Sequence, residues 1–405
     1  MDYFTSEEQE KQYCETIDKM REMRIGYEIS QERLAKLYGI SREQLNKIES
    51  YKRIVPERQL QKMCMLIRQE AGEEPLEIII DYFRVRIPTQ DVKMVLEELL
   101  RMRMERFMYL DYGFYGYNGQ YVFGDIVVMV SPKKENGVLI ELKGKGCRQF
   151  ERILEAQGRS WYRFIRDIQE KHGKWKRIDI AVNDMFGILD IAQLTEKCEK
   201  GELVTLFKSF DPCASGKISD KREENKMEMG RTLYLGSRKS DIYFCIYEKD
   251  YEQMRKNGIP LTEAKIKNRF EIRLKDDRAE QAIQDFVDHE NPCSTAFGII
   301  NHYIRFLKLG KTADKRKWET DEDWKIFLKA EDRNIKLTTK PEPYTIEQTK
   351  KWIAKQVMPS LKMLKEMDEI QGTDFVESIF QQTQLKEKHQ KLIEQIKLSP
   401  EEIIL

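Results

Sequence analysis

One stretch of the sequence carries residues that could perform covalent chemistry on a phosphate. Residues 232–250 read TLYLGSRKSDIYFCIYEKD, where a small basic loop with Arg238 and Lys239 precedes alternating polar and apolar residues. In an extended strand, this alternation places Tyr243 and Tyr247 on the same face. A tyrosine hydroxyl near basic groups can attack a phosphodiester, and the phosphotyrosine ester conserves the energy of the broken bond. The alternative is an amphipathic strand with ordinary surface tyrosines.

The two tyrosines differ in their surroundings. They are about 13 Å apart at roughly 3.3 Å per residue, too far for both to reach one phosphate. Tyr243 stands in mid-strand between Ile242 and Phe244, where its ring can serve as packing. Tyr247 stands where the strand gives way to charged residues, and an opening at a strand end suits a nucleophile that must meet a large substrate. The pattern therefore favours Tyr247.

Three further segments repeat the alternation of the tyrosine strand. They are residues 138–143 (VLIELK), 177–184 (RIDIAVND) and 269–274 (RFEIRL). If all four strands share a sheet, its apolar face packs on helices within residues 147–170. Its polar face collects acids and bases together, namely Glu141, Asp179 and Glu271 with Lys143, Arg177 and Arg273. This mixture suits a divalent cation, Mg²⁺ or Mn²⁺, held beside a polyanion, and a lattice of structural ion pairs is the alternative.

Residues 29–56 have the pattern of two short helices joined by a turn. Ser30 opens the first amphipathic helix, Gly39 ends it, and Ser41 is a good N-cap for the second. The arrangement resembles a helix-turn-helix of the Cro/CI repressor type, which binds duplex DNA. Its second helix would face the major groove with Arg42, Glu43, Gln44, Asn46 and Lys47. A plain helical hairpin used for protein contact is the alternative.

The composition limits the classes of protein that the chain can represent. Lys and Arg number 71 against 70 Asp and Glu, so net charge gives no sign of a nucleic-acid partner and any such sign must be local. Seven cysteines without CxxC or zinc spacing, and no signal peptide or long apolar run, indicate a cytosolic protein with reduced thiols and no membrane partner. With four histidines and no close pair, a metal would need carboxylate ligands.

The order of segments predicts an α+β protein with three regions. Residues 1–70 are a helical helix-turn-helix domain, residues 69–75 (QEAGEEP) include a linker, and residues 76–288 form a mostly antiparallel sheet covered by helices. Within that domain, residues 109–123 are rich in Tyr, Phe and Gly, with Asn118-Gly119 as a tight hairpin signal. Their rings could stack on unpaired bases or pack the hairpin. Residues 289–405 are predicted to be helical, in segments 294–307, 323–328, 345–367 and 374–396, with a capping box at Thr345 and a kink or division at Pro359.

Five ordered blocks over about two hundred residues resemble one family of proteins. They are residues 80–85, 140–151, 177–184, 232–249 and 268–279. They are similar to the trans-acting rolling-circle replication initiators of small Gram-positive plasmids (the Rep_trans family) and the MobT-type relaxases of conjugative elements. The N-terminal helix-turn-helix looks more like the relaxases.

The resemblance implies a metal-dependent nick of one DNA strand. It leaves a 5′-phosphotyrosine and a free 3′-hydroxyl and is later reversed by strand transfer. The family's nucleophile falls on Tyr247, and its acidic positions fall on Asp179, Glu141, Glu271 and Asp81. Asn183 stands where the family often has an acid, which puts a metal role there in doubt.

Two other functions stay open beside a relaxase acting on double- and single-stranded DNA at a transfer origin. One is a plasmid replication initiator with the same chemistry, and the other is a DNA-binding regulator with an inactive nicking domain. The resemblance also leaves open a coupling protein, a helicase and a homodimer as partners.

Overall fold

The computed structural model describes residues 7–216, 228–261, 263–328, 353–385 and 390. The chain divides into two compact units, Met1–Thr339 and Lys340–Leu405. In the second unit, the described elements are a π-helical turn (Ile353–Val357), α14 (Met358–Gln371) and α15 (Phe375–Gln382). Pro359 lies in the first turn of α14, so it divides the predicted helix as expected. The capping box predicted at Thr345 lies outside the described residues.

Four helices with their own hydrophobic core form the N-terminal part of the first unit. They are α1 (Glu7–Gly26), α2 (Gln31–Tyr38), α3 (Arg42–Glu49) and α4 (Glu57–Glu70). The Ser30 side chain caps α2, Gly39 ends it in the left-handed conformation, and Ser41 and Gln44 form a reciprocal capping box on α3. The predicted pair of helices is therefore present. Its hydrophobic core includes Leu34, Leu45 and Leu60.

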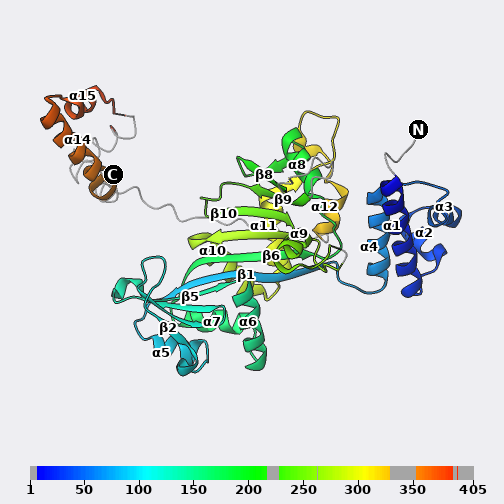
Figure 1. Ribbon diagram of the computed structural model, residues 1–405, viewed down its shortest axis with the longest axis horizontal. Coiled ribbons are helices and arrows are strands. Elements are labelled where there is room, and N and C mark those ends of the chain that lie inside the picture. The colour runs from blue at the N-terminus through cyan, green and yellow to red at the C-terminus, as the bar shows by residue number, and fades with distance from the viewer. Residues whose placement is uncertain (1–6, 217–227, 262, 329–352, 386–389, 391–405) are drawn as a thin grey trace, which may run out of the picture. The chain divides into compact units, whose positions relative to one another are not determined.

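Within the described residues, ten strands form one antiparallel sheet (Figure 1). The spatial order is β2-β3-β4-β5-β1-β6-β11-β10-β9-β8. The strands are β1 (Leu76–Ile87), β2 (Met108–Leu110), β3 (Gly119–Phe123), β4 (Ile126–Val130), β5 (Val138–Lys143), β6 (Lys174–Asp184), β8 (Phe210–Gly216), β9 (Glu228–Leu235), β10 (Ile242–Glu248) and β11 (Asn268–Lys275). The four predicted strands are β5, β6, β10 and β11, and the sheet and the α+β class are confirmed.

Helices cover the apolar face of this sheet. The helices of this domain include α6 (Gly144–Ala156), α7 (Trp161–Glu170), α8 (Ile191–Lys200), α9 (Lys249–Asn257), α10 (Asp276–His289), α11 (Pro292–Tyr303) and α12 (Glu322–Phe327). Fully buried rings from helices, such as Phe150 and Phe297, share one core with Phe83, Phe244 and Phe270 of the strands. Burying this apolar area is what holds the polar face of the sheet in a fixed register.

A β-bulge at Asp81 changes what β1 presents to the polar face. The pairing of β1 with β6 shifts register between Ile80 and Tyr82. The extra residue lets Asp81 and Tyr82 both contact polar-face residues, Arg269 and Glu141, while Ile80 and Phe83 stay in the core. The bulge therefore adds an acid and a tyrosine side by side to that face.

Two segments differ from the sequence-based expectation. Asn118 and Gly119 do not form a two-residue turn, because β2 and β3 are joined by the longer loop 111–118 and Gly119 begins β3. The boundary predicted at residue 288 cuts through one core, because Phe297, Phe306 and Phe327 pack with the sheet. The end of the helix predicted over 294–307 is instead strand β12 (Ile304–Phe306), which pairs with β7 (Leu203–Thr205).

Candidate active site

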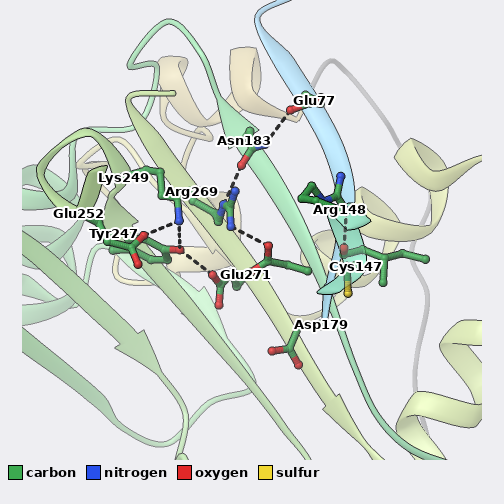
Figure 2. A network of polar contacts seen from close by, with 12 residues as sticks. Glu77, Cys147, Arg148, Asp179, Asn183, Tyr247, Lys249, Glu252, Arg269 and Glu271 are labelled. Atoms are coloured by element: carbon green, nitrogen blue, oxygen red, sulfur yellow. Dashed lines mark hydrogen bonds and ion pairs between the residues drawn. The ribbon is translucent and has the colours of Figure 1, made fainter. Parts of the chain in front are cut away.

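Tyr247 lies near the end of β10, and its hydroxyl has two polar partners. The hydroxyl donates to Glu271 Oε1 at 2.8 Å, and Lys249 Nζ lies 3.3 Å from the same oxygen (Figure 2). Glu271 stands on the neighbouring strand β11, where Tyr247 pairs with Arg269 two residues away. The alternation of both strands thus brings the phenol and the carboxylate to one face.

The strand-to-helix junction after Tyr247 positions Lys249. β10 ends at Glu248 and α9 begins at Lys249, so Glu252 lies one helical turn further on and contacts Lys249. Lys256 holds the other oxygen of Glu252. Although burial favours the neutral acid, hydrogen bonds from Lys249 and Lys256 lower the pKa of Glu252 to about 2. Glu252 is therefore a fixed negative charge that keeps the Lys249 ammonium beside Tyr247.

Arg269 on β11 connects this pair of strands to β6 and β1 through hydrogen bonds. In register, Tyr247, Arg269, Asn183 and Glu77 stand opposite one another across β10, β11, β6 and β1. Arg269 donates to Asn183 Oδ1 at 2.7 Å and to Asp81 at 2.8 Å, and Asn183 donates to Glu77 at 2.7 Å. Figure 2 shows this series of hydrogen bonds extending away from Tyr247. Asn183 thus orients Arg269 through a hydrogen bond. An acid at position 183 would form an ion pair with Arg269 instead.

A second row of paired residues lies four residues from the first along β10 and β11, with Glu271 between the two rows. Tyr243, Arg273, Asp179, Tyr82 and Lys143 stand opposite one another across β10, β11, β6, β1 and β5. Arg273 donates to Glu271 at 2.7 Å and to the Tyr243 hydroxyl at 3.2 Å, and it lies 3.7 Å from Asp179. Arg177 donates to both oxygens of Asp179, at 2.8 and 2.5 Å. Tyr243 is thus held as a hydrogen-bond partner of Arg273.

A cleft of about 610 Å³ opens over these residues. It is lined by most of the predicted site residues, Tyr247, Asp81, Asp179, Glu271, Arg177 and Arg273. Four predicted residues lie outside it. Glu141 and Lys143 stand on β5, beyond β1 and β6, and Arg238 and Lys239 lie in the loop before β10, at the other end of that strand from Tyr247. Arg238 pairs with Asp211 at 3.0 Å at that end of the strand, and the phosphate-binding role of this loop stays a prediction.

The acids of the polar face are buried rather than solvated. Glu141, Asp179 and Glu271 expose 1%, 3% and 4% of their surface. Burial raises the pKa of Asp179, and the hydrogen bond and charge of Arg177 oppose that effect. A lattice of exposed ion pairs would contribute little, whereas buried acids each require basic partners in place. The charges of this face are therefore held in place by buried partners rather than by solvent.

The surroundings of Tyr247 keep its hydroxyl protonated at rest. Burial, followed by the negative charge of Glu271, raises the pKa of Tyr247 well above its ordinary value, and Arg269 acts in the opposite direction. Attack by Tyr247 therefore requires a base in contact with the proton, and Glu271 accepts the hydrogen bond from that hydroxyl.

The predicted acids do not form a ready set of metal ligands. Among the residues that the structure describes, no three His, Cys, Asp or Glu side chains group closely enough to hold one ion. Each predicted acid instead has a basic neighbour: Asp81 has Arg269, Asp179 has Arg177, Glu271 has Arg273, and Glu141 has Lys143 at 3.2 Å. The residues present do not fit a divalent cation in this arrangement, and its use stays a prediction.

The sequence analysis missed three residues that the structure places at the cleft. Arg269 belonged to the polar face of its strand, but nothing in the pattern distinguished it from Arg273. Lys249 and Glu252 are one helical turn apart in α9, and recognising a helix that starts directly after the strand would have found them.

The residues predicted to contact DNA lie on α3, the second helix of the helix-turn-helix. Arg42, Asn46 and Lys47 are exposed on that helix. Gln44 is engaged in the capping box, where its side chain accepts from the Ser41 backbone at 3.0 Å. Gln44 is therefore less available to a DNA base than the other three.

Comparisons with known proteins identify the family of this chain. The sequence matches the replication initiation factor family over residues 173–380, which include Tyr247, Glu271 and Asp179. The chain belongs to the replication initiation factor family. Residues 77–167 match the N-terminal domain of rolling-circle replication initiation proteins, and residues 20–68 match a helix-turn-helix. The expected family and its N-terminal helix-turn-helix are thereby confirmed.

Two proteins similar to this chain are informative. The chain is 36% identical over 328 residues to "Putative DNA relaxase NicK" of Bacillus subtilis (strain 168), covering 81% of this chain and 92% of that protein. It is also similar to the structure of a rolling-circle replication initiator protein from Geobacillus stearothermophilus, with 26% identity and a TM-score of 0.55. That likeness covers 65% of this chain and all of the solved chain. Among the described helices, none has the length and apolar composition needed to cross a membrane.

Proposed function

We propose that this protein is a DNA relaxase that nicks one strand at an origin of transfer, with Tyr247 as the nucleophile. The observation that carries the proposal is the Tyr247 hydroxyl donating to Glu271 at 2.8 Å inside a cleft lined by arginines. The similarity to a relaxase over most of the chain supports it. So does the helix-turn-helix, which supplies a means of binding duplex DNA.

The nick is an in-line substitution at one phosphorus atom. Glu271 takes the proton of the Tyr247 hydroxyl as the phenol oxygen attacks. A bond forms between that oxygen and phosphorus, and the bond from phosphorus to the 3′ oxygen of the departing strand breaks. The departing oxygen takes a proton from water. The products are a 5′-phosphotyrosine and a free 3′-hydroxyl, and the reverse attack by a 3′-hydroxyl rejoins a strand and returns the proton to Tyr247.

Positive groups around Tyr247 stabilise the charge that develops on the phosphate oxygens. Arg269, Arg273 and Lys249 all line the cleft. Hydrogen bonds to Asn183, Asp81, Glu271 and Glu252 fix them before DNA arrives. Fixed donors of this kind lower the barrier because they need little reorganisation during the reaction.

The nicking experiment uses supercoiled plasmid that carries the element's own candidate transfer origin, incubated with Mg²⁺ or Mn²⁺. Open circles with protein covalently attached to the 5′ end are expected, and a plasmid without the origin serves as the control. Supercoiled DNA that stays intact with every origin and metal would favour the inactive regulator. The intact pair of Tyr247 and Glu271 argues against that outcome.

A plasmid replication initiator with the same chemistry is the second candidate. The likeness to a solved rolling-circle initiator over that chain's whole length favours it. Both candidates predict the same covalent intermediate, so the origin that is cut separates them. Cleavage of a replication origin but not of a transfer origin would select the initiator.

A further inference from the structure

The end of β2 and the loop that joins it to β3 carry a group of exposed aromatic rings. Residues 109–117 read YLDYGFYGY, and Tyr112 and Phe114 expose 53% and 55% of their surface. Tyr109 and Tyr115 are exposed to a similar extent. The rings of Tyr112 and Phe114 meet edge to face, with their centroids 6.2 Å apart. The predicted alternative of hairpin packing therefore does not account for these two rings.

Hydrogen bonds hold the loop in one conformation. The Tyr117 hydroxyl donates to the Asn136 carbonyl at 2.6 Å, and the Asn136 amide donates to the Gly116 carbonyl at 3.2 Å. A Cβ on Gly113 would lie 2.8 Å from the Tyr117 carbonyl oxygen, so the tight turn there requires glycine. A loop fixed in this way presents its rings without a large entropic cost of ordering them on binding.

A continuous series of contacts connects this loop to the active-site cleft. The Tyr115 hydroxyl donates to Glu141 at 2.9 Å, and Tyr82 contacts the same oxygen of Glu141. Tyr82 carries the Arg177 guanidinium over its ring at 4.1 Å, and Arg177 lines the cleft. The Arg84 guanidinium lies over the Tyr115 ring at 4.3 Å. From the cleft to the loop, the contacts therefore run from Arg177 to Tyr82, through Glu141 to Tyr115, where Arg84 covers the ring.

We propose that this aromatic loop, residues 109–117, stacks on unpaired bases of the single strand that leads away from the nick. The proposal rests on the proposed nicking function and adds a second contact for its substrate. Stacking on aromatic rings is the usual means of holding single-stranded DNA regardless of sequence. Tyr247 on β10 and Glu141 on β5, which the Tyr115 hydroxyl contacts, are separated by four sheet spacings of about 4.8 Å, roughly 19 Å. The strand must therefore extend several nucleotides beyond the nick to reach the rings.

Binding is measured in the Tyr247→Phe background, so that no covalent adduct forms. Fluorescent oligonucleotides carry the nick site with two or twelve nucleotides on the 5′ side, on the 3′ side or on both. We expect tighter binding when the oligonucleotide is lengthened on one side of the nick site, 5′ or 3′, than when it is lengthened on the other. The double substitution Tyr112→Ala, Phe114→Ala should remove that gain, about tenfold or more, because each stacked base contributes substantially to affinity. The short oligonucleotide cannot reach the loop, so its affinity should change less than twofold.

Two control variants make this result specific to the rings. Tyr112→Phe keeps the ring and should keep the gain from the long oligonucleotide. Leu309→Ala removes an exposed apolar side chain (70%) far along the chain and should change nothing. Equal affinities of the double variant and its parent for long oligonucleotides, or no gain from length in the parent, would overturn the proposal. Failure of the otherwise unsubstituted protein to cut the short oligonucleotide would instead contradict the nicking function.

Discussion

At the scale of single residues, the hydroxyl of Tyr247 is the atom on which the proposed chemistry depends. Tyr247→Phe removes only that oxygen, so we expect no covalent DNA adduct and unchanged folding and DNA binding. Denaturing gels of labelled oligonucleotide measure the adduct. Tyr243→Phe is the matched control, because Tyr243 lies on the same strand and face but contacts Arg273. An adduct from Tyr247→Phe together with none from Tyr243→Phe would reverse the assignment.

Glu271 should show its role as a base through the dependence of nicking on pH. Glu271→Gln keeps the shape but cannot take the proton, and loss of a general base slows a reaction by about 10²–10⁴-fold. The pKa of Tyr247 is raised by burial and by Glu271, so between pH 7 and 9 the phenol is mostly protonated. Residual nicking by the variant should therefore rise with pH, about tenfold per unit, as the phenolate fraction grows. A rate that is flat between pH 7 and 9 would remove Glu271 from this role.

Substitution of Asp179 tests whether the protein uses the predicted divalent metal. EDTA should stop nicking if a divalent cation is used, and Asp179→Ala should impair nicking strongly while DNA binding is retained. The structure adds a distinction, because Asp179 also pairs with Arg177 and Arg273. A metal ligand should be partly rescued by high Mn²⁺, whereas a residue that only orients arginines should not be. Full activity of Asp179→Ala would exclude both roles.

At the scale of elements, the packing of α6 against the turn before β4 positions the cleft wall. A Cβ on Gly146 of α6 would lie 2.3 Å from the Asp125 carbonyl oxygen, and this contact is with backbone that cannot easily move. Gly146→Ala should therefore destabilise the protein by about 1–3 kcal/mol, measured by denaturant unfolding. Gly26→Ala, also in a helix, meets no atom within 4 Å and should be neutral or slightly stabilising. Equal stability of both variants would show that α6 can shift.

At the scale of the whole molecule, recognition and chemistry are assigned to separate cores. The helical core around Leu34 and Leu45 is distinct from the core beneath the sheet. Deletion of residues 1–68 should thus weaken binding to origin duplex more than cleavage of a single-stranded oligonucleotide with the nick site. Mobility shifts and oligonucleotide cleavage measure the two effects. An equal loss of both activities would argue against a separate recognition module.

Several elements can be predicted from the sequence because their signals are local. Alternating residues fixed the faces of β5, β6, β10 and β11, and serine caps and Gly39 fixed the limits of α2 and α3. These signals suffice because side-chain direction in a strand and capping in a helix depend on neighbours in the chain. Tyr247 and Glu271 could both be chosen for the same reason.

Which of these residues meet depends on how the strands and helices pack together. Lys249, Glu252 and Arg269 reach Tyr247 because β10, β11 and α9 are fixed against one another, and no spacing in the sequence states that register. The bulge at Asp81 and the pairing order β5-β1-β6-β11-β10 likewise depend on long-range contacts. Glu141 and Lys143 were therefore grouped with the cleft by pattern, although two strands separate β5 from β11. Strand order is set by burial of the shared apolar face, which the alternation of a single strand does not encode.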